Sequence, residues 1–131
     1  MFKGVAEIMY FVPDRTQAAN WYAQLFNTQL TYLNDPDDFL LRVGAHEIWF
    51  HQADSKVPAG VAGQVAYWQV EDFDAALERA ENLGAVLYRG PLRRPDGQYM
   101  CQVKDPFGNV IGLIGPVAQP TAAVRPAGAL D

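Results

Sequence analysis

The chain has 131 residues, of which 50% are hydrophobic and 12% aromatic. This length is typical of one domain with a buried core, and no apolar run approaches the roughly 20 residues needed to span a bilayer. The formal net charge of −5 disfavours nucleic acid as a partner, because phosphate binding needs a basic surface. No signal peptide precedes the first strand-like segment, and the one cysteine, Cys101, cannot form an internal disulfide. We therefore expect a cytoplasmic protein with neither membrane nor nucleic acid as a partner.

The first half of the chain predicts a strand, a helix and three further strands. The first strand includes Ile8–Val12, and Asp14 then stands where a carboxylate caps a helix by accepting bonds from free backbone N–H groups. The helix runs from about Arg15 to Phe26 and ends at Asn27, which tolerates a left-handed conformation. Short extended segments follow at about 29–34, 39–43 and 47–52.

The second half repeats this pattern at an offset of 58 residues. A strand ends before the capping residue Asp72, and a helix from about Phe73 to Leu83 stops at Gly84. Breakers at Gly90-Pro91 and at Asp105–Asn109 help to divide the rest into extended segments at about 86–89, 99–103 and 110–114. Each half therefore predicts a βαβββ module.

These modules predict an α+β fold in one structural domain. Residues 1–52 form the first module, 53–63 a Pro/Gly/Ala-containing linker, and 64–116 the second module. The tail 117–131 has no hydrophobic periodicity, so we expect it to be loosely ordered.

Several short motifs accompany the repeat, namely Val12-Pro13-Asp14 with Ala18 and Trp21-Tyr22, Ile48–Gln52, Val70-Glu71-Asp72 with Ala75-Ala76 and Leu83-Gly84-Ala85, and Asp105–Asn109. Together with the repeat, these motifs resemble the vicinal oxygen chelate superfamily, which includes glyoxalase I, bleomycin-resistance proteins and extradiol dioxygenases. The resemblance covers about residues 5–115 and implies two modules that form a half-open barrel around a cavity, usually in a homodimer. Because members include isomerases, lyases, dioxygenases and antibiotic-sequestering proteins, the fold leaves the chemistry open.

The same resemblance assigns the superfamily's metal-ligand positions to Glu7, Trp49, Val65 and Gly112. Only Glu7 has a side chain that binds a divalent ion, so we predict neither a metal nor another cofactor. The alternative is a divalent ion held by a displaced set, in which Glu7 is joined by His51 or Glu47 from the neighbouring strand.

Strand alternation predicts which side chains face the cavity. The result is an apolar, aromatic pocket for a small organic ligand, in which Gly112 widens the floor. The alternative is that these aromatic side chains fill the barrel as ordinary core. The predicted ligand-binding residues are Met9, Phe11, Trp49, His51, Tyr67, Gln69, Val110 and Gly112.

Three functions follow from this pocket. The first is a binding protein without metal that holds an aromatic or cationic compound, with Glu7 available to pair with a cation. The second is a metal-dependent lyase, isomerase or dioxygenase using the displaced ligand set with Glu7 and His51. The third is an enzyme without metal in which Glu7, if buried, or His51 acts as a catalytic base. Whether the protein is an enzyme stays open.

Overall fold

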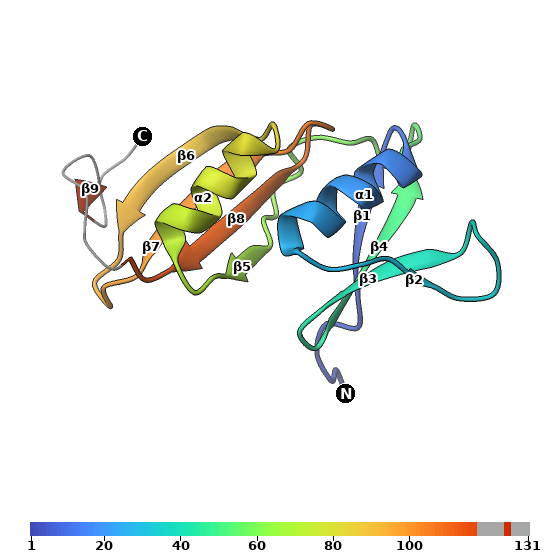
Figure 1. The fold of residues 1–131 in the computed structure, drawn as a ribbon, viewed down its shortest axis with the longest axis horizontal. Helices are drawn as coiled ribbons and strands as arrows, with labels where there is room; N and C mark the ends of the chain where they lie inside the picture. The colour runs from blue at the N-terminus through green and yellow to red at the C-terminus, as the bar shows by residue number, and fades with distance from the viewer. Residues whose placement is uncertain (118–124, 127–131) are drawn as a thin grey trace. The chain divides into compact units, whose positions relative to one another are not determined.

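The computed structural model describes residues 1–117 and 125–126 (Figure 1). The chain divides into two compact units, one from Met1 to Ala59 and one that begins at Gly60. This boundary falls inside the segment 53–63 that the sequence assigns to a linker. Each unit contains a βαβββ module with an open sheet, and the second adds the short strand β9, so the predicted α+β fold is confirmed.

In the first module, one helix packs on a four-stranded sheet of order β1-β4-β3-β2. Strands β1 and β4 are parallel, and the other two pairs are antiparallel. Strand β2 is shorter than the predicted segment 29–34, and directly after it the Leu33 N–H donates to the Asp38 carbonyl across the loop to β3. The elements are β1 (Ile8–Val12), α1 (Arg15–Phe26), β2 (Thr31–Tyr32), β3 (Phe39–Val43) and β4 (His46–Gln52).

Helix α1 begins and ends at the predicted residues. The Asp14 carboxylate accepts from the Gln17 N–H at 3.0 Å, and Asn27 ends the helix in the left-handed region at φ 53°. The buried face of α1 combines alanines with Tyr22, whose ring lies 5.1 Å from that of Tyr10 and 5.8 Å from that of Phe50. These contacts place the core of the module between α1 and the β1–β4 pair.

In the second module, α2 lies across a five-stranded sheet of order β5-β8-β7-β6-β9 (Figure 1). Helix α2 starts after the predicted cap Asp72, which accepts from the Ala75 N–H, and ends one residue before the predicted Leu83. The elements are β5 (Tyr67–Gln69), α2 (Phe73–Asn82), β6 (Val86–Arg93), β7 (Tyr99–Lys104), β8 (Val110–Gly115) and β9 (Arg125–Pro126).

Strand β6 continues past the predicted break at Gly90-Pro91. The sequence places its end near residue 89, whereas the structure extends it to Arg93. The register shift between Arg89 and Leu92 accommodates the two breaker residues, and β6 is paired with β7 on both sides of it. The predicted break is therefore wrong, because proline is compatible with an irregular strand in which its missing N–H is not required.

The Asp105–Asn109 turn is a closed hydrogen-bonded unit before β8. The buried Asp105 carboxylate accepts from the N–H groups of Phe107 and Asn109, both at 2.9 Å. The Asn109 side chain in turn accepts from the Gly60 N–H at 2.8 Å. The turn therefore orients β8 and also anchors the beginning of the second unit.

The predicted loose tail lies largely outside the described residues. Of residues 117–131, the structure describes Val117 and the short strand β9, which pairs in parallel with Leu92 and Arg93 of β6. Among the described residues, no helix is long and apolar enough to cross a membrane.

Candidate functional site

The open face of the first sheet, opposite α1, carries the predicted aromatic side chains. The parallel register pairs Met9 with Trp49 and Phe11 with His51, so these four side chains share one face. The rings of Phe11 and His51 lie 5.0 Å apart, and Met9 is 41% exposed. The structure therefore brings together the four ligand-binding residues predicted for the first module, while Tyr10 packs against the helix.

A polar group holds the Trp49 ring on this face. The indole N–H of Trp49 donates to the Glu47 carboxylate at 3.3 Å. The second oxygen of Glu47 lies 3.4 Å from the Arg42 guanidinium, across the β3–β4 pair. In the sequence, Glu47 is an alternative member of the displaced metal-ligand set. The structure shows a half-buried carboxylate that fixes the direction of an aromatic side chain.

Glu7 and His51 are not neighbours. Glu7 precedes β1, whereas His51 pairs with Phe11, four residues further along β1, which corresponds to a separation of about 13 Å. Ligands of one metal ion each lie roughly 2 Å from it. The displaced metal set with Glu7 and His51 is therefore not supported by the register.

Glu7 is also exposed, whereas the catalytic-base hypothesis required a buried carboxylate. The expectation that Glu7 is buried is therefore wrong, because Glu7 lies before β1 and its side chain is not covered by the sheet. His51 is exposed as well, and its Nδ1 lies 2.8 Å from the Gln52 carbonyl oxygen.

The open face of the second sheet carries a row of polar and aromatic groups. Tyr67 on β5 and Gln102 on β7 both pair with Gly112 on the strand between them. The Gln102 amide donates to the Tyr67 hydroxyl oxygen at 2.9 Å, and the Gln69 amide donates to Gln98 at 2.9 Å. Val110, two residues before Gly112 on β8, is buried.

Gly112 does not widen a pocket, which corrects the prediction from sequence. A Cβ atom at this position would overlap the Tyr67 ring, so the ring occupies the space that a side chain would need. The superfamily's usual carboxylate at this position would meet the same obstruction. Val65 lies before β5 and offers no ligand atom in its side chain.

The residues present therefore do not fit the superfamily's metal. Three of its four positions hold Trp49, Val65 and Gly112, whose side chains bind no divalent ion. Within residues 1–117 and 125–126, the structure contains no group of three histidine, cysteine, aspartate or glutamate side chains close enough to hold an ion.

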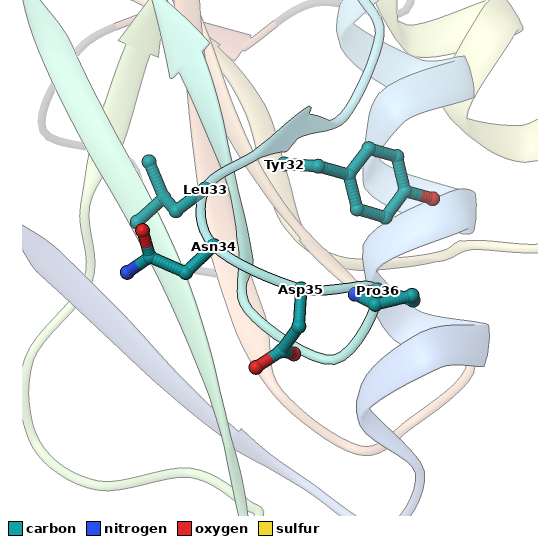
Figure 2. Close-up of a pocket in the computed structure, with 5 residues that line it drawn as sticks. All are labelled: Tyr32, Leu33, Asn34, Asp35 and Pro36. Atoms are coloured by element: carbon teal, nitrogen blue, oxygen red, sulfur yellow. The ribbon is translucent and has the colours of Figure 1, made fainter.

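A pocket of about 490 Å³, which the sequence did not predict, lies beside the β2–β3 connection. Figure 2 shows that the side chains of Tyr32 and Leu33 point to opposite sides of this loop, and that Asp35 points away from both. The Asp35 carboxylate accepts from the Asp37 N–H at 2.8 Å, which is a local turn contact. Because its polar groups do not converge, we do not assign this pocket as the functional site. It is lined by Tyr32, Leu33, Asn34, Asp35 and Pro36.

Comparison with known proteins identifies the family. A sequence profile of the Glyoxalase/Bleomycin resistance protein/Dioxygenase superfamily matches residues 4–113. The chain belongs to this superfamily. No match was found among the curated proteins.

Several solved structures share the fold. An integron cassette protein from Vibrio cholerae is 18% identical, with a TM-score of 0.70 over 88% of this chain and 96% of that one. A superfamily member from Sphaerobacter thermophilus is 18% identical, with a TM-score of 0.69 over 87% and 98%. A mutant of the fosfomycin resistance protein FosX from Listeria monocytogenes, complexed with Mn(II) and 1S,2S-dihydroxypropylphosphonic acid, is 16% identical, with a TM-score of 0.71 over 90% and 94%.

Proposed function

We propose that the protein is a small-molecule binding protein of the superfamily that works without a bound metal. Its ligand is an aromatic or cationic organic compound, which contacts the exposed aromatic side chains of an open sheet face. The observation that carries this proposal is the aromatic group on the first face, where Phe11, Trp49 and His51 lie side by side and are not covered by α1. The residues that we propose to contact the ligand are Met9, Phe11, Trp49, His51, Tyr67 and Gln69, because Val110 is buried and the Tyr67 ring covers Gly112.

The preference for a flat ligand follows from the side chains of the first face. Trp49 is half-buried, so part of its ring remains available for stacking. Its hydrogen bond to Glu47 restrains the indole before a ligand arrives, which lowers the entropy lost on binding. A rigid aromatic surface of this kind favours planar compounds.

The preference for positive charge follows from the carboxylates beside Trp49. Glu47 lies against the indole, and continuing the β1–β4 register by one residue places Glu7 opposite Glu47. A cation over the indole face is attracted both by the ring and by these carboxylates. Arg42 neutralises part of this charge, so Glu7 provides the carboxylate that is available to a ligand.

A binding measurement with two matched variants tests this function. Trp49→Ala removes the stacking surface, and we expect it to weaken the binding of N-methylquinolinium by about tenfold or more in isothermal titration calorimetry. Tyr32→Ala is the control, because Tyr32 is an exposed aromatic residue that lies outside the open face.

Two results would contradict the ligand-binding part of the proposal. The first is that no compound in a set of aromatic and cationic compounds binds the protein or raises its melting temperature. This set includes N-methylquinolinium and naphthalene derivatives. The other is an equal loss of affinity in Trp49→Ala and Tyr32→Ala. A stoichiometric divalent ion in protein purified without chelators would contradict the proposal that no metal is needed.

A further inference from the structure

A hydrogen-bonded row crosses the open face of the second module. In the register of the sheet, Tyr67 lies opposite Gly112, Gly112 opposite Gln102, and Gln102 opposite Arg89. Residues in register on neighbouring strands project from the same face. The row therefore places a phenol, an amide and a guanidinium on one face.

The Tyr67 hydroxyl in this row is oriented as a donor. Its oxygen accepts from the Gln102 amide at 2.9 Å, so its own proton is directed elsewhere. Within the described part of the chain, no residue accepts that proton. Because Tyr67 is 38% exposed, the O–H group is accessible from the open face.

Gly112 determines where this hydroxyl lies. The Tyr67 ring packs directly on the glycine backbone, at a position that any Cβ would occupy. With one side of the ring on Gly112 and its oxygen bonded to Gln102, the ring is restrained at both ends. The group is therefore ordered before any ligand binds, which favours a directional contact.

We propose that the Tyr67 hydroxyl, positioned by Gln102 and Gly112, donates a hydrogen bond to a carbonyl or carboxylate oxygen of the ligand. Arg89, next in the row, forms no ion pair with any described residue, and its positive charge favours an oxygen that carries negative charge. This inference rests on the proposed binding function and adds an acceptor group to the description of the ligand. At the position where the superfamily usually has a metal-binding carboxylate, this chain has Gly112. The Tyr67 ring occupies the space that a side chain at this position would need.

A pair of probes that differ by one carbonyl oxygen tests the inference. 2-Acetylnaphthalene and 2-ethylnaphthalene have nearly the same shape, and only the ketone accepts a hydrogen bond. We expect the native protein to bind the ketone about 2- to 10-fold more tightly than the hydrocarbon, the range of one net hydrogen bond. Tyr67→Phe keeps the ring on Gly112 and should abolish this preference, so that the variant binds the two probes with equal affinity.

Tyr88→Phe is the matched control, because Tyr88 is an exposed tyrosine of the same module and its ring lies 5.0 Å from the Lys104 ammonium. It should retain the full preference for the ketone. A preference that survives in Tyr67→Phe, or its absence in the native protein when both probes bind, overturns the inference alone. If neither probe nor N-methylquinolinium binds, the proposed function falls and the inference falls with it.

Discussion

At the scale of single residues, burial decides the chemistry of Cys101. The thiol lies on β7, and its residue is 2% exposed. Burial raises the pKa of the thiol from its ordinary value of 9.0 to about 12, and the nearby Glu81 carboxylate acts in the same direction. Since the thiolate is the reactive form, Cys101 is unsuited to nucleophilic or redox chemistry in the folded state.

We expect Cys101 in the native protein to resist a disulfide reagent such as DTNB at pH 8, and to react in 6 M guanidinium chloride. Because its pKa is higher in the folded than in the unfolded state, the stability associated with the neutral thiol is complete below pH 9. It is lost as the pH rises from about 9 to 12. In Cys101→Ala, the free energy of unfolding should not show this loss between pH 9 and 12. Rapid labelling of one thiol in native protein would contradict the assignment.

At the scale of elements, the contact between β5 and β8 depends on one glycine. Gly112 accepts the Tyr67 ring on its backbone, and further along β8 the backbone carbonyl of Val70 would obstruct a Cβ at Gly115. The two glycines therefore have different partners, a side chain for Gly112 and mainly backbone for Gly115. Only the obstruction at Gly112 can be relieved by shortening a side chain.

We expect Gly112→Ala to lower the free energy of unfolding by about 1–3 kcal/mol, the usual cost of forcing an extra group into a packed site. In a Tyr67→Ala background the same substitution should cost less than about 1 kcal/mol, because the ring is gone. Gly115→Ala should be equally costly with or without Tyr67. Urea unfolding measures the cost of Gly112→Ala and of Gly115→Ala, each with and without Tyr67→Ala. If the costs of Gly112→Ala and Tyr67→Ala simply add in the double variant, the ring does not pack on the glycine.

The elements also show where sequence patterns suffice. Asp14, Asn27 and Asp72 act through backbone groups a few residues away, so the ends of the helices were predictable to within a residue. The path of β6 through Gly90-Pro91 was not, because it depends on pairing with β7 across register shifts. Pairing of this kind is a property of the sheet and not of the local sequence.

At the scale of the whole molecule, we propose a homodimer. The resemblance to the superfamily implies this state, and both sheets are open, with β1 at one edge of the first and β5 at one edge of the second. Unpaired strand edges favour association with further protein surface.

Sedimentation equilibrium at micromolar concentration should therefore give about twice the chain mass of 14.5 kDa. Repeating the measurement at 1 M NaCl separates apolar contacts, which persist, from exposed ion pairs, which salt weakens. A monomeric mass throughout the micromolar range would contradict the dimer.

The sequence by itself determined the two modules, their helix caps and the superfamily, because these depend on periodicity and on contacts within a few residues. It also identified which side chains share the open faces, since alternation along a strand follows from backbone geometry. Only the tertiary structure decided that the Tyr67 ring fills the space beside Gly112, that Gln102 orients its hydroxyl, and that Glu7 and His51 lie apart. These outcomes depend on the register of strands distant in the chain, as between Tyr67 and Gln102, 35 residues apart.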